Sequence, residues 1–413
     1  MAVQKLKERT LMIKVLIFHA VLCSSLHGCF AAIVNGQPLS NRSTLHPMAV
    51  NSFGSSVYLP VSGNVYPLGY YSVTVEIGNP PKQFQLDIDT DLAWVQCDAP
   101  CVGCTLPRYR RYKPAKNNYV LCREPICAAV HSPNPPPCKN PTDKCSFQVE
   151  YADHVSVSGA VVSDIFPHAL SMARCGYGLH GSGTHPPPPT TGVLGLGRSK
   201  PSISTQLSSM GIAQNILGHC FNDKGGYLFF GADFIPKSGM TWTPVSQSSS
   251  DKHYSLGPAE VLFHGKPTGI KDLHVIFDTG STYTYLSSGV YGSVLNLIRK
   301  DASRKPVQEV KDKALPICWK GSRLFKSVQD VQNYFSPLAL SFAGNIQLQL
   351  SPEAYLVVTE QGNVCLGILN GTEVGLGTVN VIGDISLQSK VMIYDNKNQR
   401  MGWAYEDCTP KFG

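Results

Sequence analysis

Two Asp-Thr pairs stand far apart in this 413-residue chain, and each ends a strand-like segment, with Val-Ile-Phe before Asp278 and Phe-Gln-Leu-Asp-Ile before Asp89. Asp278 begins the sequence Asp-Thr-Gly-Ser, whereas Asp89 begins Asp-Thr-Asp-Leu and lacks the Gly-Ser. Hydrolysis of an amide by water needs a base that takes a proton from the water and an acid that protonates the carbonyl oxygen. Two close carboxyls that share one proton supply both groups, because like charges about 3 Å apart cannot both ionise. Asp89 and Asp278 therefore predict acid-favoured hydrolysis without a metal or any other cofactor.

Each Asp-Thr pair is matched by an apolar-apolar-Gly element farther along the chain. Gly195 follows Asp89 by 106 residues, and Gly383 follows Asp278 by 105 residues. A repeat at this distance is too long for a solenoid and fits a duplicated domain. Each half would then hold one carboxylate at the end of a strand, and a pseudo-twofold axis would bring the two together. The alternative is that the two Asp-Thr pairs only cap turns.

Further motifs accompany the two pairs in order along the chain. They are Leu-Ala-Trp-Val-Gln-Cys-Asp-Ala-Pro-Cys at 92–101, Val-Glu-Tyr-Ala-Asp at 149–153, Gly-Val-Leu-Gly-Leu-Gly at 192–197 and Val-Ile-Gly-Asp at 381–384. Together they resemble the pepsin-type aspartic proteases, and the cysteine-rich first half is similar to the plant nucellin-like group. The resemblance covers roughly Tyr66 to Cys408. It implies an all-β fold, a bilobal pepsin-like double β-barrel with short helices and an active-site cleft between the lobes.

The resemblance also implies roles for individual residues. The two aspartates would activate the water, the threonines that follow them would brace the two loops, and the Gly-Ser would hold a carboxylate. Tyr151 matches the flap tyrosine that closes over a substrate. Its alternative is an ordinary strand aromatic, since residues 145–151 alternate as a half-buried strand does. The predicted site residues are Asp89, Thr90, Tyr151, Asp278, Thr279, Gly280 and Ser281.

The chain departs from the pattern of that family at three places. The missing Gly-Ser after Thr90 shortens the path to Trp94 by two residues, about 6 to 7 Å of extended chain. We expect this loss to displace Trp94 from its packing register beside the flap strand. Val155 and Val157 stand where the flap is usually rich in glycine, and β-branched residues stiffen it. The segment before Gly176 is short, which predicts a truncated strand.

Two functions are compatible with these motifs. The first is an aspartic endopeptidase that favours acid and cleaves peptide bonds flanked by bulky apolar residues in a peptide or protein substrate. The alternative is a catalytically impaired pepsin-like protein that binds a peptide, a glycan or another enzyme, because Gly-Ser is missing after Thr90. The loop after Thr90 distinguishes the two hypotheses. If its shortening limits catalysis, restoring Gly-Ser should raise the activity.

Composition is typical of a secreted globular protein of enzyme size. The chain has 43% hydrophobic and 15% charged residues, with 37 Gly and 30 Pro, which suits two cores and the many turns of an all-β fold. The net charge of +7 is concentrated in no basic tract beyond residues 108–111, which we expect to form a solvated surface loop. Nucleic acid is therefore not an expected partner. The expected oligomeric state is a monomer.

The N-terminus has the features of a secretory signal peptide, because Lys5, Lys7 and Arg9 precede the apolar run 15–23 and small residues follow it. The sequence contains no other run of 18 apolar residues and no hydrophobic C-terminal tail. We therefore expect no stable membrane anchor. We therefore expect the secretory pathway, with an extracellular (apoplast) or vacuolar destination. The predicted organisation is a signal peptide at 1–31, a short propeptide or disordered leader at 32–65, an N-terminal lobe at 66–243, a C-terminal lobe at 244–408 and a tail at 409–413, with strands at 69–77 and 390–395 and helices at 203–210 and 289–302.

Cleavage after the signal peptide would remove two of the 14 cysteines, Cys23 and Cys29, and leave an even number for disulfides. The spacing of the cysteines at 97, 101 and 104 also occurs in zinc knuckles and redox motifs. With no histidine nearby, small disulfides are the favoured interpretation and no metal is expected. Asn41 and Asn370 are candidate glycosylation sites, because each begins an Asn-x-Ser/Thr sequence.

Overall fold

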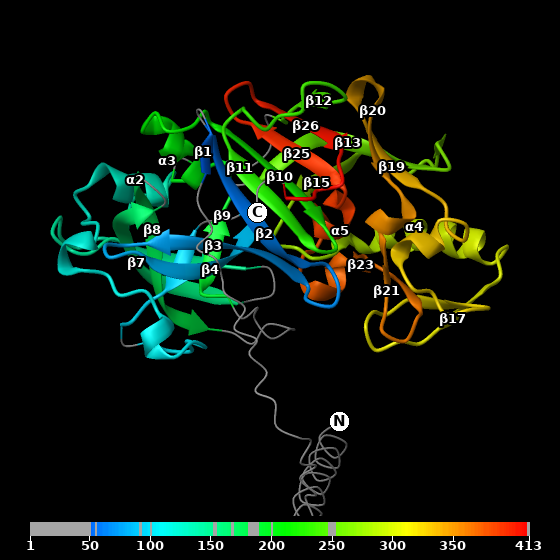
Figure 1. Cartoon of the computed structure of the whole chain (residues 1–413), viewed down its shortest axis with the longest axis horizontal. Coiled ribbons are helices and arrows are strands. Elements are labelled where there is room, and N and C mark those ends of the chain that lie inside the picture. The colour runs from blue at the N-terminus through cyan, green and yellow to red at the C-terminus, as the bar shows by residue number, and fades with distance from the viewer. Residues whose placement is uncertain are drawn as a thin grey trace, which may run out of the picture. The chain divides into compact units, whose positions relative to one another are not determined.

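The computed structural model describes residues 51–53, 56–90, 93–99, 101–151, 155–166, 169–180, 190–199, 201–246 and 253–410. These residues fall within one structural unit, Pro47–Gly413. Strands dominate it, in three sheets of 14, eight and four strands, and the helices are few and short (Figure 1). The predicted all-β class is therefore confirmed. The predicted signal peptide, Cys23, Cys29 and Asn41 lie outside the described residues.

The 14-stranded sheet joins strands from both ends of the chain (Figure 1). Its β25 and β26 come from the predicted C-terminal lobe, yet they continue the sheet beside β10 of the predicted N-terminal lobe. In order across the sheet, the strands are β12 (Thr241–Pro244), β26 (Arg400–Tyr405), β25 (Lys390–Asp395), β10 (Ile216–Asn222), β11 (Gly225–Phe230), β2 (Ser56–Asn64), β3 (Tyr70–Ile77), β4 (Lys82–Asp89), β9 (Gly192–Gly195), β5 (Trp94–Gln96), β8 (Ala169–His180), β7 (Ser156–Phe166) and β6 (Ser146–Glu150), with β1 (Asn51–Phe53) paired to β2.

The other two sheets are built from the second half of the chain alone. The eight-stranded sheet has the order β20 (Ile346–Leu350), β19 (Leu338–Phe342), β13 (Tyr254–Phe263), β15 (Leu273–Phe277), β24 (Asn380–Ile382), β16 (Thr284–Leu286) and β23 (Ile368–Asn370), with β14 (Lys266–Pro267) paired to β13. The four-stranded sheet has the order β17 (Val307–Val310), β18 (Cys318–Gly321), β22 (Val364–Leu366) and β21 (Leu356–Val358).

The two predicted helices form within a residue of their expected bounds. Ser202 begins α3 by accepting a hydrogen bond from the backbone N–H of Thr205, which is the usual N-cap interaction. In α4, Val294 and Ile298 lie one turn apart on the buried face. The helices of the described residues are α2 (Pro125–His131), α3 (Ile203–Ser209), α4 (Ser288–Ala302), α5 (Asp384–Leu387) and the short 3₁₀ segments η1 (Arg108–Arg110), η2 (Lys116–Asn118), η3 (Val328–Val331), η4 (Ala343–Asn345), η5 (Pro352–Ala354) and η6 (Gly371–Val374).

The strand that leads to each Asp-Thr pair has the same two neighbours. β4 runs parallel to β9, which pairs antiparallel with β5. Likewise, β15 runs parallel to β24, which pairs antiparallel with β16. The backbone N–H of Asp278 donates to the carbonyl of Ile382 at 3.0 Å, and that of Leu196 donates to the carbonyl of Asp89 at 2.7 Å. The apolar-apolar-Gly elements therefore lie beside the Asp-Thr strands in both halves, as the repeat predicted.

The segment expected to be an unstructured leader is partly ordered. Residues 56–64 form β2, which pairs with β3 and β11 inside the large sheet. Val57, Leu59 and Val61 are buried on one face, and Tyr58 packs into a second cluster on the other face. The expectation of disorder is therefore wrong for these residues. Apolar residues on both faces hid the alternation by which half-buried strands are recognised.

Twelve cysteines of the described residues form six disulfides. Cys101 pairs with Cys104 as a small staple, whereas Cys97, just after β5, pairs with Cys175 of the neighbouring strand β8, 78 residues farther along the chain. The preference for disulfides over a zinc knuckle is therefore confirmed. The remaining pairs are Cys122–Cys138, Cys127–Cys145, Cys220–Cys408 and Cys318–Cys365. In the part of the chain described, none of the helices is long and apolar enough to cross a membrane.

Candidate active site

The intact motif forms a tight loop at the end of β15. Its backbone holds the carboxylate of Asp278, because the N–H of Gly280 donates to Oδ1 at 3.1 Å. The hydroxyl of Ser281 donates to Oδ2 at 2.7 Å. Hydrogen bonds to a carboxylate are stronger than neutral ones. The loop therefore fixes both oxygens of this aspartate with donors of its own.

The helix α5 supports this loop from behind. The N–H groups of Asp384 and Ile385 donate to the carbonyls of Ser281 and Thr282 at 2.8 and 3.1 Å. Gly383 precedes the helix, and a Cβ at this position would collide with the carbonyl oxygens of the loop. This contact explains why the predicted Val-Ile-Gly-Asp element contains a glycine. Its glycine permits the close approach through which the helix holds the loop.

The first Asp-Thr pair meets this loop from β4. Thr90 is buried, and its hydroxyl donates to Oδ1 of Asp278 at 2.5 Å. The carboxyl of Asp89 lies directly against Gly280, where an added Cβ would lie 2.5 Å from its Cγ. The structure therefore brings both predicted catalytic carboxyls to Gly280. Residues 91–92, which follow Thr90 directly where Gly-Ser is missing, lie outside the described residues.

The two loops are not equivalent in their contacts. The hydroxyl of Thr279 is buried and has no hydrogen-bond partner among the described residues, whereas that of Thr90 reaches across to Asp278.

Gly280 does not have the backbone conformation that usually requires glycine in a turn, since its φ is not positive. What this position requires is the absence of a side chain, because the carboxyl of Asp89 occupies that space.

The predicted flap residue Tyr151 follows directly after β6. Its hydroxyl accepts a hydrogen bond from Nε1 of Trp94 at 2.7 Å, and its backbone N–H donates to the carbonyl of Val155 at 2.8 Å. Trp94 pairs with Val193 in β9 and packs with Tyr151 in one apolar cluster. The expected displacement of Trp94 is therefore wrong. The tip of the flap, residues 152–154, lies outside the described residues.

Two further carboxyls near the site were not predicted. Asp87 lies two residues before Asp89 on the same face of β4 and is partly buried. Burial raises the pKa of Asp87 to about 8, and the charge of Asp278 adds to this effect. The available signal in the sequence was the alternation of β4, which places Asp87 on the same face as Asp89.

Asp384 is the second of these carboxyls, and it is buried at the start of α5. Desolvation raises its pKa well above the usual range, and the charges of Asp87, Asp278 and Asp89 raise it further. Its Oδ1 has no hydrogen-bond partner among the described residues. Both unpredicted carboxyls are therefore neutral under acidic conditions and place no additional negative charge beside the catalytic pair.

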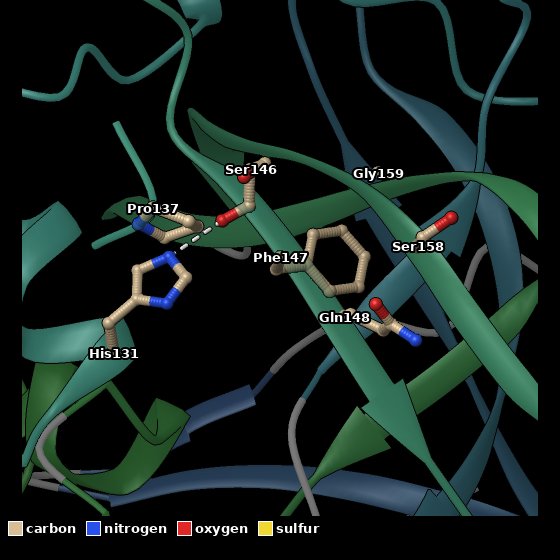
Figure 2. Close-up of a pocket in the computed structure, with 7 residues that line it drawn as sticks. All are labelled: His131, Pro137, Ser146, Phe147, Gln148, Ser158 and Gly159. Atoms are coloured by element: carbon tan, nitrogen blue, oxygen red, sulfur yellow. Dashed lines mark hydrogen bonds between the residues drawn. The ribbon is translucent and has the colours of Figure 1, made fainter. Parts of the chain in front are cut away.

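A pocket of about 470 Å³ lies elsewhere, beside β6 and β7 (Figure 2). In it, His131 of α2 faces the carbonyl of Ser146, with 2.8 Å from Nε2 to the oxygen. Phe147 of β6 and Ser158 of β7 line the same space (Figure 2). None of the predicted site residues lines this pocket.

Known protein families match the two halves of this chain separately. Family models described as xylanase inhibitor N-terminal and xylanase inhibitor C-terminal match residues 71–232 and 259–405. An aspartic proteinase of Oryza sativa subsp. indica is 37% identical over 379 residues, which cover 86% of this chain and 92% of that protein. The chain belongs to the plant pepsin-type aspartic proteinases. The predicted resemblance and the predicted class of enzyme are confirmed.

More distant members of the aspartic proteinase family and solved structures agree with this assignment. Aspartic proteinase 39 of Arabidopsis thaliana is 24% identical, with 86% of this chain and 78% of that protein covered. The crystal structure of edgp has a TM-score of 0.63 at 17% identity and covers 85% of this chain and 95% of that one. The aspartic proteinase from Irpex lacteus has a TM-score of 0.61 at 17% identity, with coverage of 86% and 99%. These structures support the bilobal β fold that the sequence predicted.

Proposed function

We propose that this chain is an endopeptidase that hydrolyses peptide bonds with a water activated between Asp89 and Asp278, and that acidic conditions favour the reaction. The observation that carries the proposal is the convergence of both carboxyls on Gly280. The family membership supports peptides or proteins as substrates. The neutral state of Asp87 and Asp384 at acidic pH is compatible with a catalytic pair that shares one proton.

The chemistry assigns a role to each group of the pair. One carboxylate takes a proton from the water as the water oxygen attacks the peptide carbonyl, and the protonated partner gives its proton to the carbonyl oxygen. When the tetrahedral intermediate collapses, the proton taken from water passes to the leaving amine. Three donors, from Thr90, Gly280 and Ser281, hold the carboxylate of Asp278 in one orientation. Such preorganisation lowers the barrier because little reorientation is left for the reaction itself.

The test is the turnover of a denatured protein by the purified chain at acidic pH, with and without a statine-type inhibitor. Asp278→Asn keeps the shape of the side chain but removes the shared proton, so proteolysis should be lost. The exposed Asp223 supplies a control, and Asp223→Asn should cleave as the parent does. Undiminished proteolysis by the Asp278→Asn variant would exclude the two-carboxylate mechanism. Inactivity of the parent chain would instead favour a pepsin-like binding protein.

We extend the proposal to the cellular location. The predicted signal peptide supports secretion to the apoplast or the vacuole, and a monomer without a membrane anchor is the proposed form. Asn370 is the proposed glycosylation site, and its Nδ2 donates to Glu373 at the start of η6. Recovery of full-length chain in the cytosol, with Met1 intact, would exclude secretion. An Asn370→Gln variant with the mass of the deglycosylated parent would support the glycan, and identical masses without deglycosylation would exclude it.

A further inference from the structure

A second site lies at the other end of β4 from the catalytic loop. A pocket of about 200 Å³ is lined by Lys82 and Gln83, which begin β4, and by Tyr109, Arg110 and Arg111 of the basic tract. Along this eight-residue strand, Lys82 is about 23 Å from Asp89, and Gln85, which also lines the pocket, is about 13 Å from it. Its function can therefore be separated from proteolysis.

The fold holds the basic tract against β4. Tyr112, which follows the tract, packs edge-on against Phe84 of β4 with ring centroids 6.1 Å apart. Backbone hydrogen bonds of 2.7 and 2.8 Å join Tyr112 to Asp98 and Gln96. The Nε of Arg111 donates to the carbonyl of Leu106 at 2.6 Å. The backbone of the tract and the side chain of Arg111 are therefore held by packed structure, and residues 108–110 are exposed, as expected of a solvated surface loop.

The pocket carries positive charge that is not neutralised. None of its lining residues is acidic. Arg108, outside the pocket, pairs with Asp98 at 2.7 Å. Lys82 and Arg110 have no ion-pair partner within the described part of the chain. A guanidinium matches the planar fork of a carboxylate, so the pocket is suited to an anion with that shape.

The other residues that line the pocket indicate which kind of molecule bears the anionic group. Tyr109 exposes 83% of its surface, so its ring is open to the apolar face of a flat ligand. The amide of Gln83 offers hydrogen bonds to hydroxyl groups, whereas the buried hydroxyl of Thr191 already donates to the carbonyl of Gln85 at 2.7 Å. The volume of about 200 Å³ is below the roughly 300 Å³ at which pockets for whole small molecules begin. It fits a single ring of a longer chain.

We infer that this pocket binds a uronate unit of an acidic polysaccharide. The carboxylate contacts Lys82 and Arg110, the sugar ring stacks on Tyr109, and neighbouring hydroxyls contact Gln83. A nucleic acid fits less well, since its binding typically rests on about six to ten phosphate contacts and the pocket offers three cations. An acidic peptide would leave the tyrosine ring without a stacking partner.

The test measures binding of polygalacturonate to the full chain by isothermal titration calorimetry, with neutral galactan, an oligonucleotide and an acidic peptide as comparisons. The double variant Lys82→Gln/Arg110→Gln should weaken polygalacturonate binding about tenfold or more, because two charge-assisted contacts are lost. Tyr109→Ala should weaken it less. Arg123→Gln/Lys139→Gln removes the same charge from exposed positions outside the pocket and should leave binding unchanged.

Two further variants sharpen the assignment. Glu76 is the direct cross-strand neighbour of Gln83, so Glu76→Gln removes a nearby negative charge and should strengthen binding. Asp278→Asn should bind as the parent does, so a failure of the proposed proteolysis leaves this inference intact. Equal losses in the two double variants, equal affinity for galactan, or oligonucleotide or peptide binding as tight as that of polygalacturonate would overturn the assignment.

Discussion

The two Asp-Thr loops follow strands that are paired in the same way, but the side-chain contacts of the two loops differ. The intact loop contacts both catalytic carboxyls. Asp278 receives donors from Gly280 and Ser281 of its own loop and from Thr90 of the other. Asp89 lies against Gly280, so the intact loop also shapes the space for the opposite carboxyl. The hydroxyl of Thr279, in contrast to that of Thr90, has no hydrogen-bond partner among the described residues. Among the described residues, the intact loop thus supplies two of the three donors to Asp278 and also the space beside Asp89.

Among the variants that test this comparison of the two loops, the largest effect is expected from Gly280→Ala. The added methyl group would occupy the place of the carboxyl of Asp89, so one of the two must move. Because a displacement of about 1 Å can cost about 100-fold in rate, acid proteolysis should fall by about 100-fold or more. Gly289→Ala is the matched control, since a Cβ there meets no atom within 4 Å. Retention of most activity by Gly280→Ala would show that the carboxyls do not meet at this glycine.

A smaller effect should separate the two threonines. Thr90→Val removes a donor to Asp278, and the loss of about 1.4 kcal/mol should reduce kcat about tenfold. Thr279→Val removes a buried hydroxyl that has no partner among the described residues, so activity and thermal stability should hold or rise slightly. Steady-state kinetics and melting curves of both variants measure the difference. Equal losses would show that the two loops brace each other symmetrically.

The strands before the two aspartates also differ, because Asp87 stands where the second copy has Ile276. The pKa of Asp87 is about 8 in the folded chain, above the value of about 4 in an unfolded one. Its stabilising contribution is therefore complete below pH 4 and is lost as the pH rises to about 8. Asp87→Asn should avoid that loss and gain at least about 1 kcal/mol of relative stability across the window.

Denaturant unfolding of parent and Asp87→Asn at a series of pH values measures this gain, with the exposed Asp223→Asn as the control. The gap between parent and Asp87→Asn should widen steadily from pH 4 to 8. Parallel curves for the two proteins would mean that Asp87 is not held neutral by the fold.

The smallest effect is expected from inserting Gly-Ser between Thr90 and Asp91. Trp94 already bonds to Tyr151 and pairs with Val193, so the insertion has no displaced strand to restore. Activity should change by less than about threefold, or about 0.7 kcal/mol of transition-state stabilisation. A large increase in acid proteolysis would show that the shortened loop limits catalysis after all.

Much of the site could be predicted because its residues belong to short contiguous motifs. The helices at α3 and α4 and the closing strand β25 were predictable from local pattern alone. The position of Trp94 was not, because its strand register depends on β9 and the flap rather than on the length of the preceding loop. The buried strand β2 also escaped prediction, since both of its faces pack against other parts of the chain.

The sequence by itself determined the duplication, the two carboxyls and the class of fold, because each is encoded in residues that lie next to one another. Tertiary structure alone decided that Gly280 is required by the approach of Asp89 rather than by its own backbone conformation. It also placed β25 and β26 in the sheet of the first half and Lys82 beside the basic tract. These features arise from contacts between distant segments, and no local pattern records which distant segment will fill a given space.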